Sequence, residues 1–243
     1  MIVSKVHKKT SLTVERKKSI LEKIKFPRKH SVTSSSKDFI LGIPFWRFYY
    51  DESKIDSDYQ YLRQLSYREN QTNWIWSCVR EDGVGGSDLH TFPQFADLYQ
   101  WMQECMDQVA QDMGMTCKLA CNSCWSHMNG PDQYLYDHTH SNCFISCNYY
   151  ASGHADDKTQ WLYPNPYFHQ TNLRPCGDWD ESKYYLTHEE PTEPGKFIVF
   201  PPMIRHKSQP NSSQCARITI GSNWFPTGLI NDRGVSHLNV EVL

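Results

Sequence analysis

PGKFIVFPPMIRHKSQPNSSQCARITIGSNW, residues 194–224, decides the fold. A Pro-Gly turn leads into the β-rich run KFIVFPP (196–202), and the two prolines that end it stiffen a corner that delivers His206. Eleven residues later Arg217 opens a second β-rich run, with Thr219 on the same face as Arg217. We predict two strands joined by this corner. The charge of Arg217 on a largely buried strand then requires an anionic partner.

A histidine pair lies upstream, in Asp137-His138-Thr139-His140. Along extended backbone, residues i and i+2 share a face, so His138 and His140 can bind one ion while Asp137 and Thr139 point away. A third ligand must come from elsewhere in the chain, and His206 is the best candidate. We therefore predict a metal site of His138, His140 and His206. We interpret the histidines that lack such a context as structural or solvent-facing: His90, His127, His154, His169, His188 and His237.

The remaining pattern predicts a mainly β fold with flanking helices. One apolar stripe at three- and four-residue intervals predicts a helix from Pro93 to Met113, followed by a stop at Gly114. The residues after it form short β-rich runs without an intervening helix, which favours an antiparallel sandwich or barrel. These runs are 117–129, 143–151, 159–164, 183–189, 196–202 and 216–225. We predict a cupin-like double-stranded β-helix, or jelly roll, with its metal core at about 117–226.

Composition divides the chain into two parts. Residues 1–38 contain eleven Lys or Arg against three acidic residues and end in the small polar stretch SVTSSSKD. We expect residues 1–38 to form a basic, flexible arm and residues 39–243 to form a single domain. The arm can attract nucleic acid or an anionic surface, although no RNA-binding signature accompanies it.

The nine cysteines and the apolar runs indicate where in the cell the protein is located. An odd number of irregularly spaced cysteines in a chain that opens MIVSKVHKK predicts reduced thiols and a cytoplasmic, intracellular protein. No apolar run is long enough to cross a bilayer, so we expect no membrane span. Cys121 and Cys124 form a lone C-x-x-C, which we place on a strand with the two side chains on opposite faces.

The ordered set of motifs between Trp125 and Trp224 resembles the Fe(II)/2-oxoglutarate-dependent dioxygenase superfamily, and in particular a small prolyl-hydroxylase-like branch of marine bacteria and phages. The resemblance covers about 100 of the 243 residues. It rests on these residues, in this order: Trp125, His138-Thr139-His140, Ser146, Tyr149-Tyr150, Pro194-Gly195, Phe200-Pro201, His206 and Arg217-Ile218-Thr219.

The resemblance implies an enzyme, a non-haem Fe(II) oxygenase that hydroxylates a small molecule or peptide with dioxygen and decarboxylates 2-oxoglutarate to succinate. It implies that His138, His140 and His206 hold the iron and that Arg217 grips the distal carboxylate of 2-oxoglutarate, with Thr219 adding a hydroxyl. Tyr150 and Asn223 are further cosubstrate-binding candidates by the same match, and ascorbate is a candidate additional cofactor.

Two departures from the family pattern keep other functions open. The usual acid at the second position of H-x-D/E is His140 here, and Cys147 replaces a glycine. A three-histidine cupin dioxygenase that does not use 2-oxoglutarate is one alternative, and a non-catalytic jelly-roll binding protein is another. The aromatic and acidic insertion between Gly153 and Pro194 is predicted to form a lid for a cationic or amide-rich substrate or to cover a sheet edge.

Overall fold

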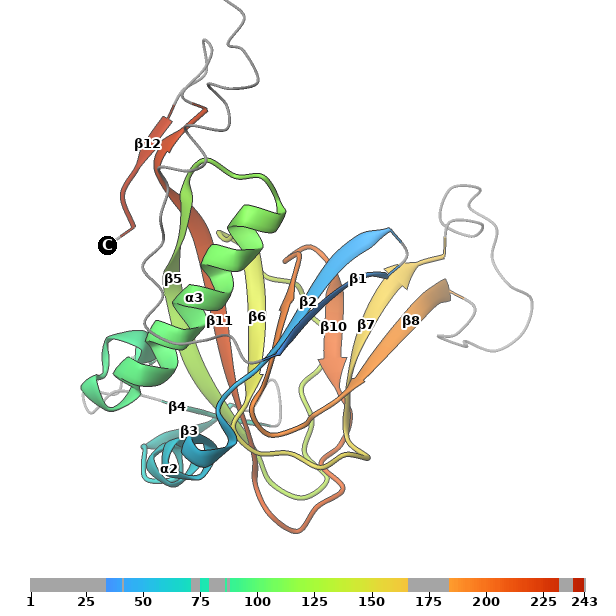
Figure 1. The fold of residues 1–243 in the computed structure, drawn as a ribbon. Coiled ribbons are helices and arrows are strands. Elements are labelled where there is room, and N and C mark those ends of the chain that lie inside the picture. The colour runs from blue at the N-terminus through green and yellow to red at the C-terminus, as the bar shows by residue number, and fades with distance from the viewer. Residues whose placement is uncertain are drawn as a thin grey trace, which may run out of the picture.

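The computed structural model describes residues 34–40, 42–70, 75–78, 86, 88–165, 184–231 and 238–242. Two antiparallel sheets face each other, and helix α3 lies across the outer face of the larger one (Figure 1). This arrangement is the jelly roll predicted from the sequence. Most of the basic arm falls outside the described residues, so the division into an arm and one domain stays a prediction.

The larger sheet has the strand order β1-β2-β9-β6-β11-β5-β4-β3, with β12 paired to β11. Its strands are β1 (Ser35–Ile40), β2 (Ile43–Tyr49), β3 (Tyr67–Asn70), β4 (Ile75–Cys78), β5 (Lys118–Asn129), β6 (Ile145–Tyr150), β9 (Lys196–Phe200), β11 (Arg217–Ile230) and β12 (Leu238–Val240). The smaller sheet has the order β10-β7-β8, formed by β7 (Lys158–Pro164), β8 (Tyr185–Pro191) and β10 (Arg205–Ser208). The helical elements are α2 (Glu52–Leu62), η1 (Leu89–Thr91), η2 (Pro93–Phe95) and α3 (Ala96–Asp112).

Helix α3 buries the apolar stripe that the sequence predicts. Leu98, Met102, Cys105 and Val109 are all buried in the core beneath the helix. The helix itself begins at Ala96 because Pro93 opens a short 3-10 turn, η2, that precedes it. Helix α3 therefore covers the outer face of the larger sheet, and we look for a functional site on the inner face.

The two faces of strand β9 pack into two different hydrophobic cores. All five of its residues are buried, which explains the apolar run at 197–200 that follows Lys196. Phe197 and Val199 face α3, whereas Ile198 and Phe200 pack between the two sheets with Trp161 of β7. The space between the sheets is therefore apolar at this end, and polar side chains gather further along.

The segment that carries His138 and His140 extends the smaller sheet. His138 forms an antiparallel bridge with His206, with both backbone N···O distances at 3.0 Å. The segment therefore lies along the free edge of β10. This pairing brings parts of the chain that are 66 residues apart into register.

Two local expectations are corrected. Strand β1 begins at Ser35, inside the 1–38 segment expected to be a flexible arm, and pairs along its length with β2. A β-bulge in β5 opposite Asn223 and Trp224 shifts the alternation, so Cys121 and Cys124 lie on the same buried face rather than on opposite ones. Both thiols are free, and a side-chain hydrogen bond with Cys121, together with burial, raises the pKa of Cys124.

Candidate metal centre and cosubstrate pocket

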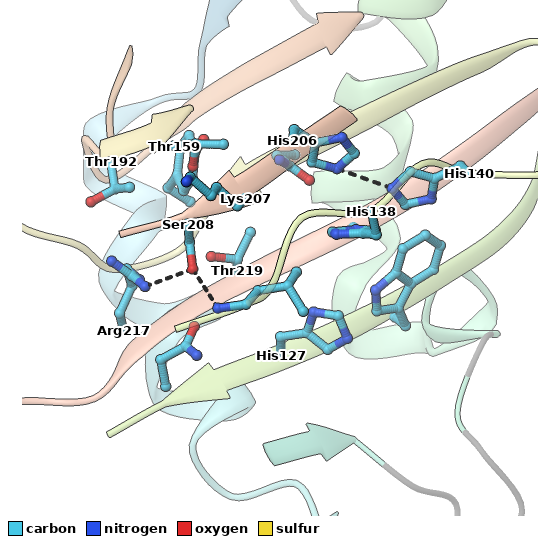
Figure 2. A pocket seen from close by; sticks show the side chains of 16 residues that line it. His127, His138, His140, Thr159, Thr192, His206, Lys207, Ser208, Arg217 and Thr219 are labelled. Atoms are coloured by element: carbon cyan, nitrogen blue, oxygen red, sulfur yellow. Dashed lines mark hydrogen bonds between the residues drawn. The ribbon is translucent and has the colours of Figure 1, made fainter. Parts of the chain in front are cut away.

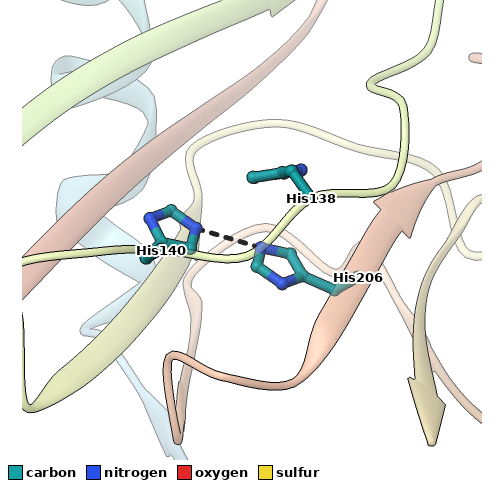
Figure 3. A group of neighbouring side chains, drawn as sticks. All are labelled: His138, His140 and His206. Atoms are coloured by element: carbon teal, nitrogen blue, oxygen red, sulfur yellow. Dashed lines mark hydrogen bonds between the residues drawn. The ribbon is translucent and has the colours of Figure 1, made fainter. Parts of the chain in front are cut away.

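Three histidines meet at one end of a pocket between the two sheets. In Figure 3 the rings of His138, His140 and His206 point toward one another. One ring nitrogen from each lies within 4.8 Å of the other two, and Nε2 of His140 is 3.2 Å from Nε2 of His206. Within the described part of the chain, no other group of three or more potential ligand side chains is this close.

Backbone carbonyls fix the orientation of two of the rings. His138 Nδ1 donates to the Tyr136 carbonyl at 2.9 Å, and His206 Nδ1 donates to the Ile204 carbonyl at 3.0 Å. Because a carbonyl can only accept, the hydrogen is on Nδ1 and Nε2 keeps its lone pair. Both rings therefore present the tautomer that binds a metal.

Burial keeps the three imidazoles neutral. Loss of solvent lowers the pKa of His138, lowers that of His140 to about 4, and lowers that of His206 well below its ordinary value. The neighbouring rings lower the last two further, since two cations cannot share this site. Neutral imidazoles are the form that binds a metal ion.

The spacing of the rings fits a metal ion. Nε2 of His140 and Nε2 of His206 lie within hydrogen-bonding distance at 3.2 Å, and two nitrogens bound to one ion also lie about 3.0–3.4 Å apart at ordinary metal–nitrogen bond lengths. The His140 ring also stacks on Trp125, with ring centres 5.6 Å apart. Trp125 lies against Gly221 of β11, where an added Cβ would come within 2.6 Å of the indole. Gly221 thus makes room for the side chain that supports His140.

Arg217 lies at the other end of the same pocket (Figure 2). It is 2% exposed, and its guanidinium donates to Asp157 Oδ2 at 3.3 Å, to Ser208 Oγ at 3.1 Å and to the Gln209 carbonyl at 2.8 Å. Burial lowers the pKa of Arg217, but the carboxylate of Asp157 counteracts that effect. The anionic partner required by the sequence is therefore Asp157.

The other residues proposed for cosubstrate binding are in different places. Thr219 and Tyr150 line the pocket, and the Tyr150 hydroxyl donates to Thr159 Oγ1 at 2.8 Å. Asn223 is not among the residues that line the pocket; its Oδ1 accepts a 2.8 Å hydrogen bond from Ser146 Oγ. The arginine end of the pocket thus combines one guanidinium with several hydroxyl groups. Asn223 lies outside the pocket, on β11 of the larger sheet.

Sequence reasoning missed several residues of the site. His127, interpreted as structural or solvent-facing, lines the pocket, as do Asn129 and Ser208. Strand alternation from Trp125 could have found His127 and Asn129, because all three residues share one face of β5. Asp157 belongs to the acidic insertion predicted to form a lid or to cover a sheet edge, and it is buried against Arg217.

The pocket as a whole suits an elongated ligand. It is open to solvent and runs from the histidines to Arg217 (Figure 2). One end can bind a metal ion and the other can bind an anion. A ligand with a metal-chelating head and a carboxylate tail matches both ends.

Comparisons with known proteins agree with this geometry. Residues 123–223 match the sequence model of the family described as "Putative 2OG-Fe(II) oxygenase". No curated protein sequence matches the chain. Among solved structures, HygX from Streptomyces hygroscopicus with nickel and 2-oxoglutarate bound matches at a TM-score of 0.52, 12% identity, 82% of this chain and 92% of that one.

Two further structures share the fold. A prolyl-4-hydroxylase from Pseudomonas putida matches at a TM-score of 0.50 and 10% identity, over 80% of this chain and 92% of the other. A 2OG-Fe(II) oxygenase family oxidoreductase from Burkholderia pseudomallei matches at a TM-score of 0.50 and 12% identity, over 72% of this chain and 79% of the other. The match over residues 123–223 makes this part of the chain similar to the Fe(II)- and 2-oxoglutarate-dependent oxygenases, and these structures confirm the jelly-roll fold.

Proposed function

We propose that this protein hydroxylates a small molecule or peptide, with Fe(II) held by His138, His140 and His206 and 2-oxoglutarate held by Arg217 at the far end of the pocket. The supporting observation is the pairing of three converging neutral imidazoles with a buried guanidinium in one pocket. When bound, Fe(II) supplies the dioxygen chemistry that couples oxidation of 2-oxoglutarate to oxidation of a substrate.

The chain's own residues position the reactants. His138 and His206 are oriented by the carbonyls of Tyr136 and Ile204, and His140 is supported by Trp125. Arg217 and Thr219 bind the distal carboxylate, while Tyr150 shapes the wall between the two ends. Asn223 does not line the pocket and instead accepts a hydrogen bond from Ser146.

A third histidine in place of the usual acid changes the charge of the site. Three neutral ligands leave the full charge on a divalent ion, which favours anionic ligands such as the head of 2-oxoglutarate. The same ligand set also accepts other divalent metals, because imidazole suits several of them. We therefore expect the choice of iron to depend on which metal ions are available and on binding of 2-oxoglutarate to the metal, and not on the affinity of the three histidines alone.

Two features of the chain bear on its cellular location. Within the described residues, no helix combines the length and the apolar character needed to span a membrane. Seven cysteines among the described residues are free, which supports a reducing, intracellular compartment: Cys105, Cys117, Cys121, Cys124, Cys143, Cys147 and Cys215. Binding of nucleic acid by the basic arm, use of ascorbate and membership of the marine bacterial and phage branch stay predictions from the sequence.

Succinate release tests the proposed function. We expect the purified protein to form succinate from 2-oxoglutarate only when both Fe(II) and dioxygen are present, because both are needed for decarboxylation. His206→Ala should abolish this release, and His154→Ala should not, since His154 is an exposed histidine outside the pocket. Oxygen uptake that does not require 2-oxoglutarate would instead indicate the three-histidine cupin chemistry.

A further inference from the structure

The charge of Arg217 is already balanced before a ligand enters. Asp157 is 2% exposed, and its other carboxylate oxygen accepts the Ser212 backbone N–H at 3.0 Å, so it is anchored in place. A second carboxylate arriving at Arg217 would put two buried negative charges beside one positive charge. Such a site needs neutral hydrogen-bond donors to stabilise the incoming anion.

Ser208 supplies one such donor. Its Oγ accepts two hydrogen bonds, from the Leu135 backbone N–H at 2.8 Å and from Arg217 at 3.1 Å, and both converge on this hydroxyl in Figure 2. A serine oxygen has two lone pairs and one hydrogen. Because both lone pairs are occupied, the O–H is left to donate. In the described part of the chain it has no acceptor, and Ser208 lines the pocket.

Asn129 supplies a second donor. It is 3% exposed, lines the pocket and lies directly opposite Arg217 in the β5–β11 register. Its amide nitrogen is buried and has no hydrogen-bond partner among the described residues. A buried N–H group without a partner is costly, so its retention on the pocket wall points to a ligand that satisfies it.

We propose that Ser208 and Asn129 donate hydrogen bonds to the distal carboxylate of 2-oxoglutarate, beside Arg217. The inference rests on the proposed function and adds two specificity-determining residues to it. Ser208 and Asn129 select for an anionic tail on the 2-oxo acid, whereas the histidine end binds the 2-oxo acid head. These two residues therefore discriminate between 2-oxoglutarate and 2-oxopentanoate, which has the same chain length but no distal carboxylate.

Calorimetric titration of the Mn(II)-loaded full chain with each acid tests this. We expect Ser208→Ala and Asn129→Ala each to weaken 2-oxoglutarate binding about tenfold, the effect of one hydrogen bond to a charged group. Binding of 2-oxopentanoate should be unchanged by either substitution. The double variant should lose about a hundredfold if the two donors act independently.

Ser126→Ala is the matched control. Ser126 is buried on β5, where its hydroxyl contacts Tyr67, and it does not line the pocket. This variant should bind both acids as the wild type does. The inference is overturned if the Ser208 and Asn129 variants bind 2-oxoglutarate normally or lose both acids equally. If the wild-type protein binds neither acid, the proposed function fails as well.

Discussion

Two arginines are buried in the described part of this protein, and they differ in what surrounds them. Arg47 on β2 contacts Glu190 through Nε at 2.8 Å and through a second nitrogen, and it contacts Asp38 at 2.6 Å. Lys196 shares Glu190 at 2.9 Å. Arg217 instead has one carboxylate, Asp157, and lines the pocket.

The difference separates a structural ion pair, that of Arg47, from the binding group that we propose Arg217 to be. Arg47 ties three strands together, since Asp38 lies on β1 and Glu190 on β8, and its guanidinium has acceptors on every nitrogen. Arg217 carries the same guanidinium group but lines the pocket. There it lies near the Ser208 hydroxyl and the Asn129 amide, which have hydrogens without an acceptor among the described residues. Burial of an arginine alone therefore does not indicate function; what matters is whether a ligand can reach the guanidinium.

The largest expected effect is on stability. Arg47→Met should lower the free energy of unfolding by about 3 kcal/mol, because it breaks a buried ion-pair network and leaves Glu190 with fewer donors. Urea denaturation measures this loss. Binding of 2-oxoglutarate to the folded variant should match the wild type. A loss of cosubstrate affinity without a loss of stability would reverse the roles assigned to the two arginines.

The pH dependence checks the cause of that loss. Burial alone would raise the pKa of Glu190, but hydrogen bonds from His188, Arg47 and Lys196 hold it well below its ordinary range. Glu190 therefore adds stability above its unfolded pKa and loses it as the pH falls through the lowered value. The free energy of unfolding should differ between the wild type and Arg47→Met by a constant amount from neutral pH down to about pH 5. Below about pH 5 this difference should shrink.

A smaller effect, on binding, is expected at Arg217. Replacing Arg217 by Met leaves Asp157 buried without a partner, so Asp157→Asn is combined with it to remove both charges. We expect the double variant to bind 2-oxoglutarate about 10- to 100-fold more weakly, as for loss of a charge-assisted contact, and to keep most of its stability. Calorimetry and denaturation measure the two properties. Wild-type affinity in this variant would place the carboxylate elsewhere.

The sequence predicted the parts of the site that follow from local alternation. His138 and His140 share a face because they are two residues apart, and β9 was recognised from its apolar run. The bulge that puts Cys121 and Cys124 on one face could not be predicted, because an extra residue in a strand leaves no compositional mark. Nor could the pairing of Asp157 with Arg217, which depends on how two distant segments pack.

Metal stoichiometry tests the central claim most directly. Anaerobic titration of the wild-type chain with Fe(II), followed by measurement of bound iron, should give one ion per chain, and His154→Ala should behave in the same way. His206→Ala should lose binding, since it removes one of three converging imidazoles. Wild-type iron content in the His206 variant would contradict a metal centre built from His138, His140 and His206.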